Sequence, residues 1–140
     1  MPGSPPGRRR ALLREGAWLT VQGPALRVVV VDNDRAVVDL LVLDLGLEGH
    51  DVVGTATDGP GAVDRCAIER PDVLVIDMKL GPGPSGLDVA RQVRDPATRI
   101  ILHTNYVTAD VVRAARGLGV TVVEKGSLST LRRAVADSRA

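Results

Sequence analysis

The chain has 140 residues and a formal net charge of +1, and 44% of its residues are hydrophobic. This length suits one domain with a single core. The single cysteine, Cys66, excludes an internal disulfide, and no Cys/His spacing indicates a metal cage. No apolar stretch reaches membrane-spanning length and the N-terminus carries no secretory signal. We therefore expect a cytoplasmic protein with no membrane partner.

The charge is divided unevenly along the chain. Residues 1–24 hold four arginines against one glutamate, whereas the remainder has a small excess of acidic residues. That mild acidity argues against a nucleic-acid-binding surface on the remainder. The first part mixes Pro, Gly and Arg without a clear pattern and predicts a disordered leader, with residues 11–19 as a candidate short helix. Residues 25–140 form the predicted folded domain.

Strands and helices alternate through the predicted domain. Short runs rich in Val, Ile and Leu predict strands at residues 26–31, 51–55, 73–76, 99–103 and 121–124. The segments after them predict helices at residues 35–48, 59–69, 86–94, 108–118 and 127–136. This order predicts an α/β fold in which a five-stranded parallel sheet has helices on both faces, in a doubly wound (βα)5 arrangement.

Polar residues come directly after four of the predicted strands. They are Asp32, Asn33 and Asp34 after the first, Asp77 after the third, Thr104 after the fourth and Lys125 after the fifth. The carboxyl ends of parallel strands share one edge of a sheet, so we expect these side chains to converge in one crevice. Taken alone, Asp77 is an ordinary loop cap and Lys125 an ordinary surface lysine, but four matching strand ends favour a site.

The residue types in this crevice indicate phosphoryl chemistry. Clustered carboxylates repel one another and favour a hard divalent cation with oxygen ligands, and Mg²⁺ fits. A lysine and a hydroxyl group opposite them, Lys125 and Thr104, are suited to hold phosphoryl oxygens. The chemistry predicted from these groups is attack by Asp77 on a phosphoryl group to give an acyl phosphate.

Four stretches carry a resemblance to a known family. They are VVVVDND at 28–34, PDVLVIDMKLGPGPSG at 71–86, RIILHT at 99–104 and VTVVEK at 120–125. From about Leu26 to Ala136 the chain resembles a CheY-like receiver domain of the two-component response regulators. The resemblance implies a domain that accepts a phosphoryl group from a sensor histidine kinase or phosphotransfer protein with Mg²⁺, and that turns over no external substrate.

The resemblance also implies a role for each matching residue. Asp77 is the implied phospho-acceptor, and Thr104 and Lys125 would hold the phosphoryl oxygens. The implied metal ligands are Asp32, Asn33, Asp77 and the backbone carbonyl of Lys79. Lys79 and Tyr106, each two residues beyond a site residue, would flank the path of the water that hydrolyses the acyl phosphate.

Some positions depart from the family pattern. Asn33 supplies a neutral amide where the family usually has an acid, so we expect weaker metal binding unless Asp34 contributes. Asn105 is bulkier than the small residue that the family favours and is expected to narrow access to Asp77. Val122 occupies the strand position where the family has a switching aromatic ring.

Two alternative functions stay open at this point. The first is a pseudo-receiver, an interaction module that never takes phosphate, and it is supported by Asn33 and Asn105. The second is a phosphatase of the haloacid-dehalogenase type, with Asp32 as nucleophile in a DxD motif. That chemistry needs a further acidic pair after its lysine, and beyond Lys125 only Asp137 remains.

The predicted helix at residues 35–48 is apolar almost all round, and only Asp39, Asp44 and Glu48 interrupt it. A surface helix normally shows one apolar stripe. The pattern indicates either a wide core-facing stripe or a docking face for a phosphodonor helix bundle or a second copy of the chain. We expect either a stand-alone adaptor or a receiver whose effector domain, for example a DNA-binding domain, lies outside this chain.

Overall fold

The computed structural model describes residues 10–12, 18–20 and 25–139. Its strands are β1 (Arg10–Leu12), β2 (Trp18–Thr20), β3 (Arg27–Val31), β4 (Asp51–Ala56), β5 (Val73–Ile76), β6 (Arg99–Thr104) and β7 (Thr121–Glu124). Its helices are α1 (Arg35–Leu47), α2 (Gly59–Glu69), α3 (Gly86–Gln92), α4 (Ala109–Gly117) and α5 (Leu128–Asp137). From β3 onwards every predicted element is present, and the prediction of an alternating α/β fold is confirmed.

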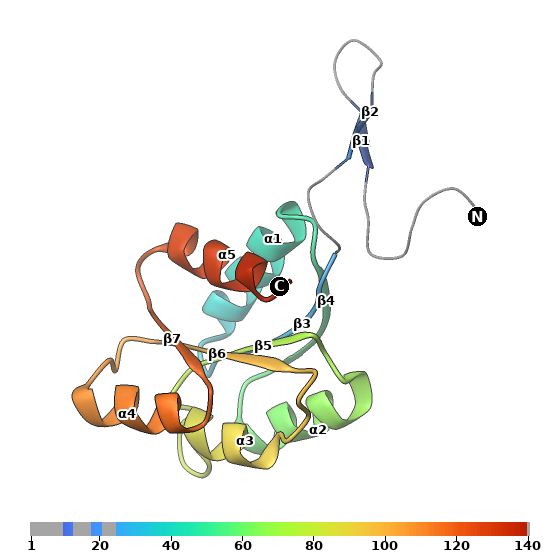
Figure 1. The fold of residues 1–140 in the computed structure, drawn as a ribbon. Helices are drawn as coiled ribbons and strands as arrows, with labels where there is room; N and C mark the ends of the chain where they lie inside the picture. The colour runs from blue at the N-terminus through green and yellow to red at the C-terminus, as the bar shows by residue number, and fades with distance from the viewer. Residues whose placement is uncertain (1–9, 13–17, 21–24, 140) are drawn as a thin grey trace.

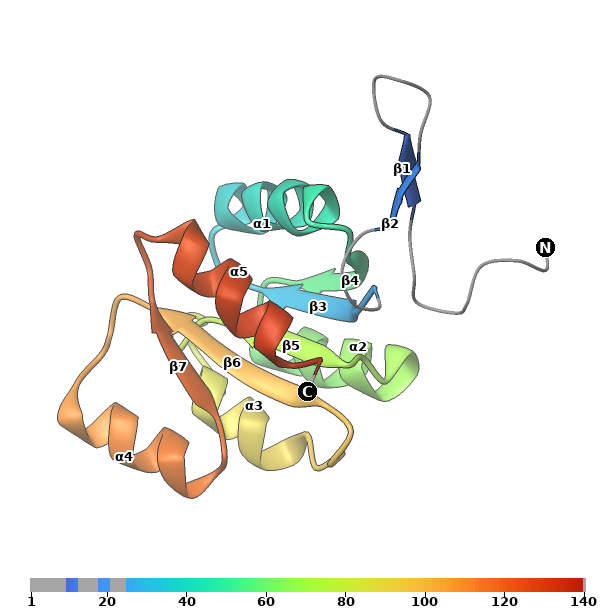
Figure 2. The same cartoon turned by 45° about the horizontal axis from the view of Figure 1, so that its top comes forward.

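The sheet has the order β4-β3-β5-β6-β7, and all of its neighbouring strands run parallel. Helices α1 and α5 cover one face of it, and α2, α3 and α4 cover the other (Figures 1 and 2). The chain leaves β3 first towards β4 and then returns to the other side of β3 to form β5. The direction of winding therefore reverses beside β3, and a doubly wound fold binds its ligands at the carboxyl ends of the strands there.

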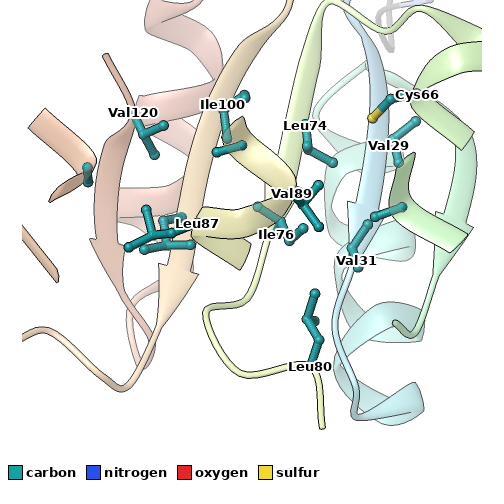
Figure 3. Close-up of a cluster of buried hydrophobic side chains, with 14 residues drawn as sticks. Val29, Val31, Cys66, Leu74, Ile76, Leu80, Leu87, Val89, Ile100 and Val120 are labelled. Atoms are coloured by element: carbon teal, nitrogen blue, oxygen red, sulfur yellow. The ribbon is translucent and has the colours of Figure 1, made fainter. Parts of the chain in front are cut away.

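Alternating side chains divide the core between the two faces of the sheet. Along β3, Val29 and Val31 pack under α2, α3 and α4, as Figure 3 shows, whereas Val28 and Val30 pack under α1 and α5. Successive residues of a strand point to opposite faces, so a strand buried on both faces is apolar at every position. This explains why the predicted strands are continuous aliphatic runs. The same alternation determines towards which face of the sheet the residue after each strand points.

The prediction for residues 11–19 is wrong where the structure describes them. Strands β1 and β2 pair antiparallel, with Arg10 opposite Thr20 and Leu12 opposite Trp18. The described residues of this stretch therefore form a short ladder and no helix. The other residues for which a disordered leader was predicted, 1–9, 13–17 and 21–24, lie outside the described part of the chain.

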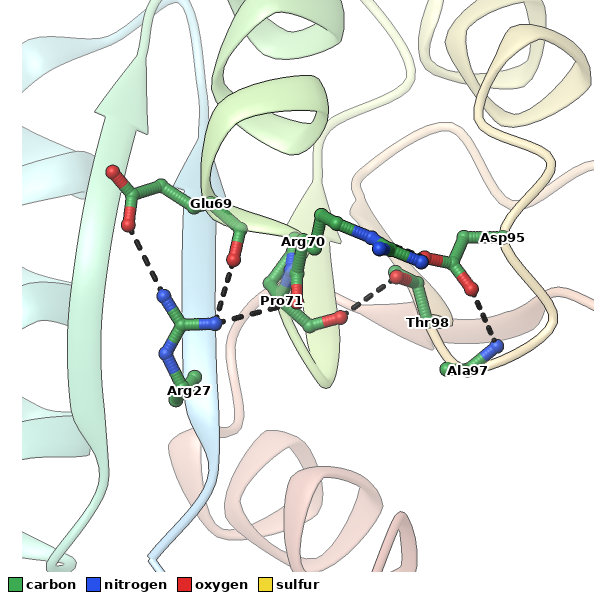
Figure 4. Close-up of polar contacts among 7 residues, drawn as sticks. All are labelled: Arg27, Glu69, Arg70, Pro71, Asp95, Ala97 and Thr98. Atoms are coloured by element: carbon green, nitrogen blue, oxygen red, sulfur yellow. Dashed lines mark hydrogen bonds and ion pairs between the residues drawn. The ribbon is translucent and has the colours of Figure 1, made fainter.

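A polar network fixes the amino edge of the sheet, opposite the predicted site (Figure 4). The guanidinium group of Arg27 donates to the backbone carbonyl of Glu69 at 2.6 Å and to its carboxylate at 3.1 Å. The buried hydroxyl group of Thr98 donates to the carbonyl of Pro71 at 2.7 Å. These bonds tie the start of β3 to the end of α2, and the start of β6 to the residues before β5.

One ion pair joins the two helices on the α1–α5 face. The carboxylate of Asp44 on α1 is buried, and it accepts hydrogen bonds from Arg132 on α5, whose Nε lies 3.0 Å from Oδ2. A buried carboxylate without such a partner is strongly destabilising. The pair therefore allows an acidic residue to sit between α1 and α5.

Within the described residues, no helix is long and apolar enough to cross a membrane.

Candidate functional site

The parallel sheet brings the predicted site residues to one edge and one face. Val31 and Ile76, the last residues of β3 and β5, pack under α2, α3 and α4. Alternation then turns the next residues, Asp32 and Asp77, towards the α1–α5 side. Val123 is packed on the α1–α5 side of the sheet. Lys125 lies two residues further along and therefore points to the same side. Three strands thus deliver two carboxylates and one ammonium group to one place.

The ammonium group of Lys125 binds both carboxylates. Its Nζ lies 2.7 Å from Oδ2 of Asp32 and 3.0 Å from Oδ2 of Asp77. The exposed fractions are 1% for Asp32 and 5% for Asp77, so both acids are almost fully removed from water. Opposite charges that lie this close together and are shielded from water attract each other far more strongly than the same charges would at the protein surface. The three-residue ion cluster is therefore the electrostatic centre of the site.

The pKa of Lys125 is raised above its ordinary value. Burial by itself lowers the pKa of this ammonium group, but hydrogen bonds to Asp32 and Asp77 and the charges of those carboxylates outweigh it. A raised pKa means that the cluster stabilises the fold fully below the ordinary lysine pKa, and that this contribution is lost as the pH rises through the raised value. Lys125 is therefore a firmly cationic group throughout the neutral range.

Asp32 is held by the start of α1. Its Oδ1 accepts a hydrogen bond from the backbone N–H of Asp34 at 2.9 Å, while Oδ2 faces Lys125. The side chain of Asp34 in turn caps α1, because its Oδ1 accepts from the N–H of Ala36 at 2.9 Å. One oxygen of the Asp34 carboxylate is therefore engaged in capping α1. Asn33, which lies between Asp32 and Asp34 in the sequence, is exposed and lines the pocket.

Asp77 has one oxygen that the fold leaves without a hydrogen bond. Its Oδ2 faces Lys125, whereas Oδ1 is buried and has no hydrogen-bond partner among the described residues. Buried polar atoms in proteins are almost always paired, so an orphaned carboxylate oxygen calls for an explanation. A metal ion or a phosphoryl group supplies one, since each interacts with a carboxylate oxygen.

Gly86 lets the loop after Asp77 fold closely against it. A Cβ atom at Gly86 would lie 2.2 Å from the backbone oxygen of Asp77, so any side chain would push the loop away. The N–H of Gly86 donates to the carbonyl of Met78 at 2.8 Å, and α3 begins at this residue. The start of α3 is thereby held against the backbone of Asp77 and Met78.

Thr104, Lys79 and Tyr106 form the β6 side and the mouth of the site. Thr104 is fully buried, and its Oγ1 accepts a hydrogen bond from the N–H of Tyr106 at 3.1 Å. The Nζ of Lys79 lies 4.1 Å from the centre of the Tyr106 ring, a cation–π contact. This contact joins the loop after β5 to the loop after β6.

The residues around this cluster enclose a surface pocket of about 570 Å³. Its lining includes most of the predicted site residues, namely Asp32, Asn33, Asp34, Asp77, Lys79, Asn105, Tyr106 and Lys125. Thr104 lies just beneath the surface, where it is fully buried. The structure thus brings these residues together at one pocket. Asn105 and Tyr106 are exposed at its mouth.

The pocket offers oxygen atoms of the kind that Mg²⁺ prefers. The carboxylates of Asp32 and Asp77 and the amide of Asn33 line it, and Lys79 lines it as well. Among the described residues no group of three His, Cys, Asp or Glu side chains is placed to hold a metal ion. Beside the two buried carboxylates, the pocket is lined by the neutral amide of Asn33. The buried, orphaned Oδ1 of Asp77 fits a cation, whereas the donor set carries fewer charges than three carboxylates would.

A comparison with known families identifies this arrangement. The sequence model of the response regulator receiver domain matches residues 28–135. The chain belongs to this family. The matched range therefore includes the whole ion cluster, from Asp32 after β3 to Lys125 after β7.

Solved structures agree with that assignment. The receiver domain is 30% identical to the signal receiver domain of a response regulator NarL from Mycobacterium tuberculosis, with a TM-score of 0.75, and the match covers 82% of this chain and 96% of that one. It is 28% identical to a LuxR-family two-component response regulator from Aurantimonas sp. SI85-9A1, with a TM-score of 0.77 and coverage of 82% and 85%. The fold is also that of CheY from Borrelia burgdorferi, at 22% identity and a TM-score of 0.73, with coverage of 81% and 89%.

The geometry of the receiver domain speaks against Asp32 as a nucleophile. Both oxygens of Asp32 are occupied, one by Lys125 and the other by the N–H of Asp34. Asp77 instead keeps an oxygen without a partner among the described residues. The expectation of a phosphatase that attacks through Asp32 therefore has no support from the site or from the family.

Sequence reasoning missed His103, the residue before Thr104. It is buried on β6, on the same face as Asp77 and Lys125, and its Nδ1 has no hydrogen-bond partner among the described residues. Burial first, and then the charge of Lys125, lowers the pKa of His103, so the ring is neutral at physiological pH. A polar residue directly after the aliphatic run 100–102, still within the predicted strand at 99–103, was the available signal.

We predict that Gly86→Ala displaces the loop after Asp77. Because the new methyl group has no space beside the Asp77 carbonyl, we expect an overpacking cost of about 1–3 kcal/mol in unfolding free energy. Chemical denaturation of both proteins measures this. The matched control is Gly117→Ala on α4, where a Cβ meets no atom within 4 Å and the same change is expected to be neutral or stabilising. Equal effects at the two glycines would contradict the close approach.

Proposed function

We propose that this receiver domain accepts a phosphoryl group on Asp77 from the phosphohistidine of a sensor histidine kinase or phosphotransfer protein in the cytoplasm. The observation that carries the proposal is the state of Asp77. One of its oxygens is neutralised by Lys125, and the other is buried without a hydrogen-bond partner in the described part of the chain. A carboxylate with a free lone pair beside a fixed cation is equipped as a nucleophile.

The transfer itself moves one phosphoryl group between two protein side chains. The free oxygen of Asp77 attacks phosphorus, the bond between phosphorus and the donor imidazole nitrogen breaks, and the imidazole leaves with the bonding electron pair. The product on this chain is an aspartyl phosphate. Because the group stays on the chain and no external substrate is turned over, the domain acts as a switch component and not as an enzyme.

Lys125 and Thr104 are placed to hold the product. Negative charge gathers on the phosphoryl oxygens during transfer, and an ammonium group already 3.0 Å from Asp77 stabilises it by charge-assisted hydrogen bonds. The Oγ1 of Thr104 accepts from the N–H of Tyr106, which leaves the hydroxyl hydrogen available to donate. Movement of Thr104 towards the phosphoryl group would carry the change to the loop after β6.

The proposed metal ligands are Asp32, Asn33, Asp77 and the backbone carbonyl of Lys79, and the first three line the pocket through oxygen-bearing side chains. When bound, Mg²⁺ supplies positive charge that offsets the repulsion between the carboxylates and the incoming phosphoryl group. The cluster of Lys125 with two acids leaves one uncompensated negative charge for the cation. Asn33 adds an oxygen without adding charge.

The output that we propose is a change of surface contacts relayed to an effector. Solved relatives include a LuxR-family two-component response regulator from Aurantimonas sp. SI85-9A1, 28% identical to this chain. A LuxR-family response regulator of the same fold, from Staphylococcus aureus, is described as DNA-binding. A DNA-binding effector domain outside this chain is the recipient of the signal that we propose. A stand-alone adaptor that binds a partner protein is the other form that the same site supports.

A second candidate function rests on two exposed amides. Asn33 and Asn105 stand at the pocket where the family has an acid and a small residue, and both are exposed. A pseudo-receiver that binds partners without phosphate would need neither metal nor an accessible Asp77. The orphaned oxygen of Asp77 favours the phosphorylated form over this one.

The first prediction concerns the acceptor. Incubation with acetyl phosphate and Mg²⁺ is expected to add one phosphoryl group per chain, labile at alkaline pH, and Asp77→Asn is expected to abolish it. Intact-mass spectrometry measures the adduct. Asp64→Asn, an exposed acid on α2, is the matched control and is expected to be phosphorylated like the original protein. No adduct from acetyl phosphate and none from a kinase would establish the pseudo-receiver instead.

The second prediction concerns the metal. Asn33→Asp adds a charged ligand, so we expect tighter Mg²⁺ binding and a larger rise in melting temperature with Mg²⁺. The same change is expected to lower stability without metal, because a further carboxylate joins Asp32 and Asp77. Thermal melts with and without Mg²⁺ measure both effects. Asn105→Asp adds equal charge on the β6 side, and an equal Mg²⁺ response there would show that Asn33 is no ligand.

The third prediction concerns the lifetime of the aspartyl phosphate. Lys79 and Tyr106 contact each other at the pocket mouth, and neither brings a carboxylate or an imidazole that could activate a water molecule. We therefore expect slow hydrolysis, accelerated by Lys79→Asn and by Tyr106→Glu. The decay of purified phosphorylated protein measures it, with Arg91→Asn on α3 as the control. Decay rates unchanged by both substitutions would mean that the pair does not limit water access.

A further inference from the structure

His103 is the second place where the fold leaves a buried polar atom without a partner. Within the described part of the chain, two buried side-chain atoms make no hydrogen bond, Oδ1 of Asp77 and Nδ1 of His103. The residues before His103 on β6, from Ile100 to Leu102, are aliphatic and buried, so an apolar side chain would suit this position. An unpaired buried nitrogen costs stability, and departures of this kind are found mainly where function uses them.

His103 lies on the face of the sheet that carries the ion cluster. Ile101, two residues earlier, packs on the α1–α5 side, and alternation turns His103 to the same side. The pairing of β5 with β6 ends one residue before Asp77 and one residue before His103, which makes these two residues neighbours at the strand ends. On its other side, His103 is opposite Val123 of β7. The ring therefore lies between the strand that leads to Asp77 and the strand that leads to Lys125.

The side chain of Lys125 has to cross β6 to reach the carboxylates. The strands lie in the order β3, β5, β6, β7 (Figure 2), and Lys125 follows β7 whereas Asp32 and Asp77 follow β3 and β5. The ammonium group nevertheless lies 2.7 Å from one acid and 3.0 Å from the other. His103 is the β6 residue that points to this face at this edge, so the lysine extends past its ring. In agreement, the pKa of His103 is lowered by burial and then by the charge of Lys125.

The two nitrogens of the His103 ring differ in their surroundings. Nδ1 is enclosed without a partner, whereas Nε2 is not among the enclosed atoms that lack one. A neutral imidazole carries its N–H on one nitrogen and a lone pair on the other. The N–H belongs on Nε2, where it is not trapped without an acceptor, so Nδ1 carries the lone pair. An ammonium group has three hydrogens, and the two carboxylates take one each, so Lys125 keeps one to donate.

We infer that His103 is a positioning residue for Lys125, whose ammonium group its Nδ1 holds by a hydrogen bond while the phosphoryl group is transferred to Asp77. The inference rests on the proposed phosphotransfer and adds a residue to it. In the resting site two carboxylates hold the ammonium group. When an oxygen of Asp77 bonds to phosphorus, that carboxyl group loses its charge and attracts the cation less. A neutral acceptor on β6 then keeps the cation beside the phosphoryl oxygens.

The first test compares three substitutions of His103 by the rate at which acetyl phosphate with Mg²⁺ labels the full chain. The amide of His103→Asn stands near the position of Nδ1, and that of His103→Gln stands near Nε2. His103→Leu removes both nitrogens and keeps an apolar side chain. We expect labelling to be slowed on the order of tenfold in the Leu and Gln variants, and to stay within about twofold in the Asn variant. Intact-mass spectrometry measures the rates.

Thermal stability separates this role from a purely structural one. Because His103→Leu removes an unpaired buried atom, we expect a melting temperature at least as high as that of the original chain, together with slower labelling. The matched control is His50→Leu. His50 is also 5% exposed, but its Nδ1 accepts from the N–H of Leu26 at 3.3 Å at the other edge of the sheet. That variant is expected to be less stable and to be labelled at the original rate.

Nitrogen NMR observes the ring directly. In the resting chain we expect the hydrogen of His103 on Nε2 and none on Nδ1, and phosphorylation of Asp77 is expected to shift the Nδ1 resonance in the direction that marks an accepted hydrogen bond. A hydrogen on Nδ1, or an Nδ1 resonance that phosphorylation leaves in place, overturns the inference.

Failure of this inference and failure of the proposed function give different results. If the original chain is labelled and the Asn, Gln and Leu variants of His103 share one rate, the inference fails and the proposed function stands. If the original chain takes no phosphoryl group from acetyl phosphate or from a kinase, both fail. If His103→Leu does not fold, the comparison of the Asn variant with the Gln variant decides alone.

Discussion

The ammonium group of Lys125, held between Asp32 and Asp77, is the interaction on which the rest of the site depends. Two carboxylates removed from water repel each other, and a single cation within 3.0 Å of both makes that burial tolerable. The three groups come from strands β3, β5 and β7, so their contact requires that the sheet be complete and in register across its width. The cluster thus links the electrostatics of the pocket to the integrity of the whole fold.

The surrounding structure holds this cluster on two sides. On one side, Asp34 caps α1 while its N–H binds Asp32, so the start of the helix and the position of the acid are set together. On the other side, the absence of a side chain at Gly86 brings the start of α3 against the Asp77 backbone. Helix ends and a close backbone approach therefore hold the carboxylates in the positions to which the strands bring them.

The pocket has an unusual balance of charge for its proposed task. Asn33 contributes an oxygen without a charge, and Lys79 lies over the Tyr106 ring at the mouth. A pocket with less negative charge attracts a cation less strongly, and a cation at its entrance attracts anionic donors.

The sequence by itself determined the order of elements and the identity of the site residues. Continuous aliphatic runs ending in Asp32, Asp77 and Lys125 predict buried parallel strands, and parallel strands place their carboxyl ends together. Only the tertiary structure decided which atoms meet: that Lys125 bridges both acids, and that Oδ1 of Asp77 is left over. The same holds for His103, whose burial beside the cluster depends on strand register and not on its neighbours in sequence. Local pattern specifies faces and edges, whereas distances between residues far apart in the chain depend on how the helices pack across the sheet.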